Sequence, residues 1–379
     1  MTERELFLEM IEGFAQKVVK PIAQEIDEEE KFPLETVRQM AKFGLLGLPF
    51  PKDVGGVGAS FSSYIDCVRV LSKYCATTSV IVSAHISLAC EPIFKFGTRE
   101  QKERFLPKML KGEYLGAFCL TESGAGTDSS NQQTKAIDKG DHYEISGSKI
   151  FITNAGYAYV YIVFASTAPE LKLKGISAFI ITSDMEGFSV GPKEKKMGIR
   201  GSSTAEIVLD KVKVPKSNLL GNPGDGFKIA MTTLDGGRIG IAAQALGIAE
   251  GAYEKTISYV KTRKQFGQTI ASFQNTQFVI ADMKTQIEAA RLLVYKSAND
   301  KELNLNITQS AAMAKLFASE TAMFVANKAI QLHGGYGYIR DLEIERYLRD
   351  AKITEIYEGT SEVQKMVISG RELKWILSV

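Results

Sequence analysis

The sequence predicts an α+β fold made of three consecutive segments, which are helical, β and helical again. From Glu5 to about Leu110 the apolar residues recur at helical spacing. Between Tyr114 and about Gly226 the pattern changes to the alternation typical of β-strands, and helical spacing returns after the turn sequence GNPGDGF. The chain has no alternating strand–helix–strand units and no internal repeat, which argues against a parallel α/β sheet.

The first helical segment is predicted over residues 1–113. Leu6, Met10, Phe14 and Val18 have the spacing of one helix face, and the stretches ETVRQMAKFGLLGLPF and CVRVLSKYCATTSVIVSAHISLA have the same period. The Pro/Gly-rich stretch FPKDVGGVGAS, residues 50–60, predicts a loop between two helices.

The β segment is predicted over residues 114–226 as an antiparallel domain. Its strand-like runs, separated by Gly, Lys and Asp turns, are HYEISGSKIFITN, YVYIVFAS, GISAFIIT and TAEIVLDKVKVP. The second helical segment, residues 227–379, is predicted to contain one very long helix and several others. These runs cover residues 227–263, 274–299, 308–333 and 363–377.

Composition restricts the classes of function. The 379 residues include 46 basic and 44 acidic side chains, and this net charge of +2 argues against nucleic acid or an anionic membrane as the main partner. The start, MTERELFLEM, does not resemble a secretion signal, and no apolar stretch approaches the length of a membrane span, so we expect a cytoplasmic protein. The four cysteines are predicted to be reduced core thiols. The three histidines are too scattered for a metal site or a Ser-His-Asp triad.

Two familiar nucleotide-binding motifs do not match. A Rossmann site needs a strand, the motif G-x-G-x-x-G and a helix, and neither GAGTDS nor GVGASF has the third glycine or these flanks. No P-loop motif occurs either. A nucleotide cofactor would therefore need another kind of site.

The stretch IYEGTSEVQ, residues 356–364, interrupts a helical run near the end of the chain. Ser361 and Gln364 have the spacing of a capping box, so Glu358 is predicted to lie in the joint between two helices. The backbone amides of residues 359–361 would then point out of the second helix and favour a negative group. Taken alone, the stretch is better explained by a solvated surface acid followed by a helix terminator.

The stretch LDGGR places two glycines, Gly236 and Gly237, inside the predicted long helix. Each costs about 1 kcal/mol relative to alanine, so the missing side chains need a reason. Close approach of a ligand and a helix-packing notch are both compatible with the pattern. Asp235 and Arg238, three residues apart, are predicted to share a helix face.

Five stretches together resemble the acyl-CoA dehydrogenase family over essentially the full length, in the right order and at the right intervals. They are AFCLTESGAGTDSS, KIFITN, LDGGRIGIAAQALG, RKQFGQTIASFQ, and QLHGGYGYIRD leading into DAKITEIYEGTSE. Within that family the chain looks most like the butyryl-CoA dehydrogenases of anaerobic bacteria. The resemblance implies an N-terminal helical domain, a middle β domain and a C-terminal four-helix domain. It also implies FAD, a coenzyme A thioester substrate, a homotetramer and an electron-transferring flavoprotein as partner.

The resemblance also assigns site residues by position. The FAD of the same subunit would contact Phe118, Leu120, Thr121, Gly126, Thr127, Phe151, Thr153, Thr360 and Glu362. The FAD of a neighbouring subunit would be reached by Arg263, Gln274, Gln331, Leu332, Gly334 and Gly335, and Phe266 is assigned to the cofactor as well. The thioester is expected at Thr127, Asp235, Arg238 and Gly359, with no metal. Many relatives have Trp at the position of Phe151, so apolar packing is kept here while an indole N–H is lost. Taken alone, Arg263 could also be a cation at a helix end.

The implied reaction removes an α-proton through the carboxylate of Glu358 and a β-hydride through the flavin, giving a trans-2-enoyl-CoA. The backbone N–H of Glu358 would help to stabilise the enolate oxygen, and a raised pKa of the carboxylate would suit proton transfer. Branched- and long-chain relatives carry their base at the position of Gly237.

The acyl group of the substrate and the direction of the reaction are separate questions. Relatives that act on dicarboxylate thioesters need a cation for the second carboxylate in the first domain, and the stretch TTSVIVSAHIS offers none, which favours an uncharged acyl chain. That the chain is short is implied by the resemblance. The alternative reading is an enoyl-CoA reductase that works in reverse on an acrylyl or aryl-acrylyl thioester. An acyl-CoA oxidase and an inactive scaffold are disfavoured, because the additional oxidase domain is missing and the base and cofactor stretches are present.

Overall fold

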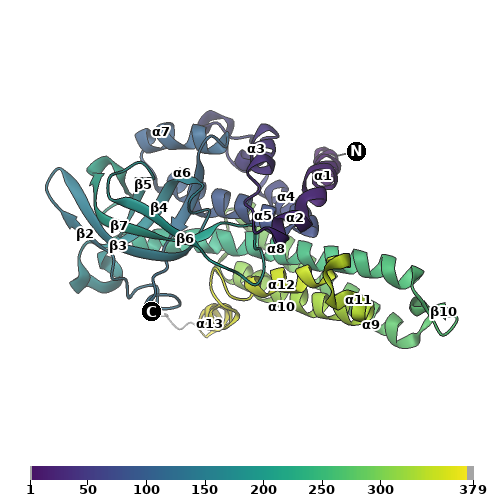
Figure 1. The fold of residues 1–379 in the computed structure, drawn as a ribbon. Helices are drawn as coiled ribbons and strands as arrows, with labels where there is room; N and C mark the ends of the chain where they lie inside the picture. Colours follow the sequence, from purple (N-terminus) through teal and green to yellow (C-terminus); the bar gives the residue numbers. More distant parts are fainter. Residues whose placement is uncertain (1, 374–379) are drawn as a thin grey trace.

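The structure, a computed structural model, describes residues 2–373 and has the helical–β–helical order that the sequence predicts (Figure 1). The long helix α8, Gly226–Thr262, packs against helices of both helical segments. The β-sheet lies towards one end of α8, and a small hairpin lies at its other end (Figure 1). This helix therefore connects two distant parts of the molecule.

The first helical segment packs α4 and α5 onto α8, and the predicted loop over residues 50–60 contains one short 3₁₀ turn, Lys52–Val54. Side-chain caps begin several helices: Ser60 caps α4, and Thr98 with Gln101 forms a capping box on α7. The helices are α1 (Glu3–Phe14), α2 (Ala23–Glu28), α3 (Leu34–Lys42), α4 (Phe61–Tyr74), α5 (Ala76–Ser83), α6 (Glu91–Phe96) and α7 (Arg99–Leu110). Two π-helical turns, Ala15–Val19 and Ala84–Cys90, interrupt the series.

The run Ala76–Phe96, which joins α5, a π-helical turn and α6, is long and apolar enough to cross a membrane by length and composition. Its length exceeds what the sequence analysis allowed for any apolar stretch. However, 72% of its apolar window is buried inside the protein. It is a core helix of the first segment. Of the four buried free cysteines, Cys75 directly precedes this run and Cys90 lies within it.

The middle segment is one sheet with the strand order β6-β7-β3-β2-β4-β5-β8, and β1 is paired to β4. Most neighbours are antiparallel, as predicted. The β1–β4 pair is parallel, however, and a single parallel bridge joins β2 to β4. The strands are β1 (Leu115–Cys119), β2 (Lys135–Asp138), β3 (His142–Thr153), β4 (Ala158–Ser166), β5 (Ile176–Thr182), β6 (Phe188–Lys193), β7 (Thr204–Pro215) and β8 (Leu219–Leu220).

The second helical segment surrounds α8 with further helices, of which α10 makes the most extensive contact. The helices after α8 are α9 (Gln274–Glu302), α10 (Thr308–His333), α11 (Gly335–Tyr338), α12 (Ile344–Thr354) and α13 (Ser361–Glu372). A two-stranded hairpin of β9 (Lys264–Gln265) and β10 (Gln268–Thr269) follows α8. Residues 374–377 of the predicted run 363–377 lie outside the described residues.

Candidate active site

Glu358 lies between the end of α12 at Thr354 and the start of α13 at Ser361, as the sequence predicts. Its backbone has φ 52°, a left-handed conformation that is uncommon for a residue with a side chain, and Gly359 follows with φ 96°. The predicted cap is wrong by one residue. The N-cap is Thr360, whose hydroxyl accepts from the N–H of Val363. The side-chain amide of Gln364 donates instead to the carbonyl of Gly359 at 2.8 Å.

The joint exposes unused backbone donors. In the described part of the chain, the N–H groups of Glu358, Gly359 and Thr360 have no acceptor, whereas Ser361 N–H donates to the carbonyl of Glu355 at 2.9 Å. Ser361 is therefore not one of the free donors that were predicted. Three consecutive free amides beside the N-terminus of α13 suit a negatively charged or electron-rich oxygen of a ligand.

The carboxylate of Glu358 faces α8 at Gly237. A Cβ atom at position 237 would lie 2.2 Å from Glu358 Oε2 and 2.8 Å from Leu88 Cδ2, so only glycine leaves room for the acid. The neighbouring Gly236 differs, because a Cβ there would meet only the end of the flexible Lys301 side chain, at 2.9 Å. Close approach of Glu358 thus explains Gly237, and Glu358 is not a solvated surface acid.

Two effects shift the pKa of Glu358 in opposite directions. Burial raises the pKa of this carboxyl from 4.5 to about 7, while the nearby cations Lys315 and Arg238 lower the pKa. The Oε2 atom has no hydrogen-bond partner in the described part of the chain. Arg238 donates to Asp235 at 2.7 Å, which confirms that these two residues share a face, and Asp235 accepts a second bond from Thr308. Glu358 therefore has a raised pKa, and its Oε2 atom is free to accept a proton or a hydrogen bond from a ligand.

A second group of predicted residues surrounds the loop over residues 121–127. The loop closes on itself through mutual backbone hydrogen bonds between Glu122 and Ala125. The buried carboxylate of Glu122 accepts from Lys149 Nζ at 2.7 Å and from the N–H of Gln133 at 2.6 Å. Ile150 N–H donates to the carbonyl of Thr121 at 2.9 Å, so the loop is fixed to strand β3.

The residues on both sides of this loop differ in exposure. Phe151 has φ 59° and is 61% exposed, an unusual combination for a large apolar residue next to a buried lysine. Thr153 pairs with Thr204 in the sheet, Leu120 is buried, and the ring of Phe118 packs on Phe164. Gly126 and Thr127 are exposed on the loop. The strand that holds the loop thus carries an exposed aromatic ring, and the loop itself has exposed residues at Gly126 and Thr127.

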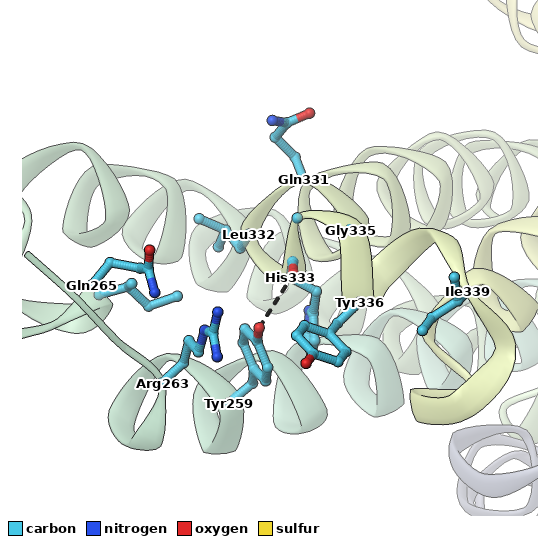
Figure 2. Close-up of a pocket in the computed structure, with 11 residues that line it drawn as sticks. Tyr259, Arg263, Gln265, Gln331, Leu332, His333, Gly335, Tyr336 and Ile339 are labelled. Carbon is cyan, nitrogen blue, oxygen red and sulfur yellow. Dashed lines mark hydrogen bonds between the residues drawn. The ribbon is translucent and has the colours of Figure 1, made fainter.

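A third group lines a cleft of about 540 Å³ at the far end of α8. Figure 2 shows Tyr259 of α8 and Arg263, the residue that follows this helix, facing His333 and Tyr336 from α10 and α11. Tyr259 stacks on His333 at 4.2 Å, and its hydroxyl donates to the carbonyl of His333. Of the predicted residues, the cleft brings together Arg263, Gln331, Leu332, Gly334 and Gly335.

Two predicted cofactor residues lie outside the lining of this cleft. Phe266 is 93% exposed at the turn of the β9–β10 hairpin, and Gln274 is exposed at the first turn of α9. Gly237 and Arg263 are separated by about two thirds of the length of α8, which corresponds to roughly 39 Å along the helix axis. The predicted cofactor residues therefore do not form one cluster: Thr360 and Glu362 follow Glu358 in the joint before α13, whereas the cleft residues lie around the far end of α8.

Sequence reasoning missed several residues of the site. Lys315 is fully buried beside the Glu358 turn. The sequence signal that could have identified it is a single lysine in the Ala-rich stretch SAAMAKLFASE. Lys149, inside the strand that leads to Phe151, gave a similar signal. Leu88 had none, because its position against Gly237 depends on how the helices cross.

Comparison with known proteins identifies the family of the chain. The acyl-CoA dehydrogenase N-terminal, middle and C-terminal domain models match residues 1–113, 117–212 and 224–373. The three matched domains show an enzyme of the oxidoreductase class, and this family implies a flavin cofactor. The chain belongs to the acyl-CoA dehydrogenase family.

Relatives in curated collections and among solved structures cover nearly the whole chain. The short-chain specific acyl-CoA dehydrogenase of Clostridium acetobutylicum is 56% identical, over 97% of each chain, and the acryloyl-CoA reductase (NADH) of Anaerotignum propionicum is 47% identical, over 98% of this chain and 95% of the other. The butyryl-CoA dehydrogenase structure of Megasphaera elsdenii has a TM-score of 0.97 at 48% identity, covering 98% of this chain and 99% of the other. A chain from work on the electron transferring flavoprotein of Acidaminococcus fermentans and electron bifurcation also has a TM-score of 0.97, at 49% identity over 99% of each chain.

Proposed function

We propose that the protein catalyses the FAD-dependent α,β-dehydrogenation of a short acyl-CoA, converting butyryl-CoA to crotonyl-CoA with Glu358 as the base. The observation that carries the proposal is the contact of the Glu358 carboxylate with the side-chain-free surface of Gly237, beside three free backbone amides. The similarity to a short-chain acyl-CoA dehydrogenase and to a butyryl-CoA dehydrogenase supports the chain length.

Proton removal is the step that Glu358 would perform. An α-proton of a thioester is weakly acidic, so the base works best when its pKa is near the working pH. Burial raises the pKa of Glu358 to about 7, and its Oε2 lone pair has no competing donor in the described structure. The carboxylate is thus basic enough to accept the proton and still ionised in a large fraction of molecules at neutral pH.

The enolate oxygen that forms next needs hydrogen-bond donors already in place. The N–H of Glu358 is one of the three free amides, because the left-handed backbone at residues 358 and 359 removes these groups from helical hydrogen bonding. The same residue would therefore provide the base through its side chain and an oxyanion donor through its backbone. Asp235, Arg238, Gly359 and Thr127 are the remaining residues proposed to contact the thioester.

The flavin is proposed to be FAD, which when bound supplies the hydride acceptor. The exposed ring of Phe151, the open loop at Gly126 and Thr127, and the free amide of Thr360 fit its ring and ribityl chain. The cleft at Arg263 offers a planar cation next to a glycine with φ 61° at position 334, which suits a pyrophosphate. Because this cleft lies far from Glu358, we propose that it binds the FAD of another subunit in a homotetramer.

The acyl group is proposed to be uncharged. The helix that contains Leu88 is almost entirely buried, and its one histidine, His85, is held by the N–H of Gly116 and the carbonyl of Met109. Burial lowers the pKa of His85 to about 4, so it provides no cation for a second carboxylate at neutral pH. A dicarboxylate thioester would leave an unpaired buried charge at this wall.

The reverse reaction, reduction of an acrylyl thioester, is a second candidate because a relative named acryloyl-CoA reductase is 47% identical over nearly the whole chain. Either direction needs an electron carrier, and the similarity to a chain from work on an electron transferring flavoprotein supports that class of partner.

A turnover panel tests the proposed function. Purified yellow protein is mixed with C4, C6, C8, isovaleryl, glutaryl and acrylyl thioesters, with a dye or an electron-transferring flavoprotein as acceptor or donor. We expect fastest flavin bleaching with butyryl-CoA, and a fall of roughly 10²–10⁴-fold in Glu358→Gln with flavin still bound. A colourless protein that cannot be reconstituted with FAD contradicts the proposal, as does near wild-type bleaching in Glu358→Gln.

A further inference from the structure

A buried lysine lies directly behind the turn that carries Glu358. Lys315 is in the middle of α10 and is fully buried on a face shared with Ala311, Ala318 and Ala322. Its Nζ donates to the carbonyl oxygen of Gly359 at 2.7 Å. Among the described residues no carboxylate oxygen lies within 4.0 Å of this ammonium group. A buried cation without a direct ion pair is costly, so its presence needs a reason.

The charges around the turn indicate that Lys315 acts mainly on Glu358. Arg238, the other nearby cation, is already paired with Asp235 at 2.7 Å. Glu358 is the foremost acid whose charge acts on Lys315, ahead of Glu355 and Glu362. The titratable and charged groups that interact with Glu358 are Tyr64 of α4, Arg238 of α8, Lys315 of α10 and the preceding Tyr357. Asp235 is the partner of Arg238, and Lys301 of α9 lies at the neighbouring Gly236. Glu355 at the end of α12 and Glu362 of α13 act on Lys315. Lys315 is the member of this set that is both cationic and hydrogen-bonded to the turn.

We propose that Lys315 is a positioning residue for the base: it fixes the Gly359 peptide, and its charge keeps Glu358 ionised at working pH. The proposal rests on the proposed function, since it takes Glu358 to be the base. The carbonyl of Gly359 accepts from both Lys315 and Gln364, so its direction is set by two donors.

The hydrogen bond also orients a donor of the site. A trans peptide points its C=O and N–H in opposite directions. Holding the Gly359 carbonyl towards α10 therefore turns the free N–H of Thr360 away from α10, to the side where the amides have no protein acceptor. One lysine would thus fix both the backbone donor and the protonation state of the adjacent acid.

The charge effect has a definite sign. Burial alone would raise the pKa of Glu358 further, and the positive charge of Lys315 opposes this rise. Burial lowers the pKa of Lys315 itself to about 8, so it remains a cation at neutral pH. Removing the charge should leave Glu358 protonated over a wider pH range, because an opposite charge at short range shifts a carboxyl pKa by about one unit or more.

The first test measures the pH profile of flavin reduction by butyryl-CoA in the FAD-loaded enzyme, by rapid mixing. In Lys315→Met we expect the acid limb to move up by about one pH unit, with a roughly fivefold slower reduction at pH 7 that recovers by pH 9. Lys315→Arg keeps the charge and should keep the wild-type limb. Lys315→Gln, a second uncharged variant, should show the displaced limb. The control is Lys365→Met, which removes an exposed cation of α13 that pairs with Glu320 of α10.

The second test reads the acid directly and needs no turnover. The infrared difference between each protein and its Glu358→Gln counterpart reports the protonated carboxyl of Glu358 as a function of pH. We expect the midpoint to be higher by about one unit in Lys315→Met and unchanged in Lys365→Met. An unchanged midpoint, or a loss of reduction that is equal at all pH values, would overturn the proposal. If no thioester reduces the wild-type flavin, the proposed function is wrong, whereas the infrared comparison still decides the role of Lys315.

Discussion

At the scale of the residue, the proposed role of Glu358 as a base conflicts with the stability of the fold. Burial raises the pKa of Glu358 from 4.5 to about 7, so between these pH values the folded protein binds more protons than the unfolded chain. The stability gained from this group is fully present below pH 4.5 and is lost as the pH rises through 7. An ionised Glu358 at pH 8 therefore destabilises the fold.

This conflict predicts the stability of Glu358→Gln. Because the variant cannot ionise, it should become more stable than the wild type as the pH rises from 5 to 8, by up to roughly 3 kcal/mol. Urea unfolding of both proteins at pH 5, 6, 7 and 8 measures the difference. Glu170→Gln, a change at an exposed acid of the sheet segment, is the control and should show no such trend. A constant difference across the range would mean that the surroundings of Glu358 do not raise its pKa.

Gly237 allows the base to be moved. A Cβ at this position would lie 2.2 Å from Glu358 Oε2, so the two sites present side chains to the same space. The double variant Gly237→Glu with Glu358→Gly should recover measurable flavin reduction relative to Glu358→Gln, with a changed chain-length preference. Gly237→Ala alone should displace the carboxylate and slow reduction by roughly tenfold or more, since a misplaced base loses its geometry.

The control for this experiment is Gly236→Ala, where the added methyl group meets only the movable end of Lys301. Rapid-mixing measurement of flavin bleaching compares the four variants. No recovery in the double variant would argue that α8 does not face the substrate α-carbon.

At the scale of the element, the loop over residues 121–127 depends on one buried ion pair. Lys149 Nζ contacts Glu122 Oε1 at 2.7 Å and also donates to Gln132 and to the carbonyl of Leu120. Lys149→Met would leave the carboxylate of Glu122 buried without its cation, and removing one partner of a buried pair costs roughly 3–5 kcal/mol. We expect this loss in urea unfolding, together with weaker FAD binding because the loop is proposed to contact the flavin.

Lys135→Met removes an exposed lysine of the neighbouring strand β2 and serves as the control. A destabilisation of Lys149→Met below about 1 kcal/mol would show that the ion pair does not hold the loop.

Local periodicity explains which elements the sequence predicts. Helix α10 matches its predicted range, residues 308–333, because small and apolar residues repeat regularly along it. The parallel pairing of β1 with β4 could not be predicted, since pairing between distant strands leaves no trace in either strand alone. The cap at Thr360 was missed because Ser361 has an equally suitable hydroxyl one position later. Glu358 and Gly237 stood out through helix-breaking glycines, whereas Lys315 and Leu88 became part of the site only through tertiary packing.

At the scale of the whole molecule, the residues proposed to bind the cofactor are spread along the helical bundle. Gly237, which faces Glu358, lies 26 residues before Arg263, and Arg263 follows α8 at the hairpin end, away from the β-sheet (Figure 1). Large apolar side chains are exposed near the Arg263 end, among them Phe266 in the hairpin and Tyr338 in α11. Exposed apolar surface of this kind indicates an interaction site. Assembly that places this end against the flavin of another subunit would cover the apolar surface and complete the cofactor site in one step.

This arrangement predicts that FAD binding and assembly are coupled through Arg263. A ligand held between subunits stabilises the assembly by mass action, so Arg263→Ala should weaken FAD binding by roughly tenfold or more and also lower the proportion of tetramer. Analytical ultracentrifugation with absorbance at flavin and protein wavelengths measures both quantities, with and without added FAD, and excess FAD should restore part of the tetramer. Lys261→Ala, a change at the exposed last turn of α8, is the matched control, because Lys261 does not line the cleft. If Arg263→Ala retains stoichiometric FAD while sedimenting as a monomer, the cleft at Arg263 does not bind the flavin of a neighbouring subunit.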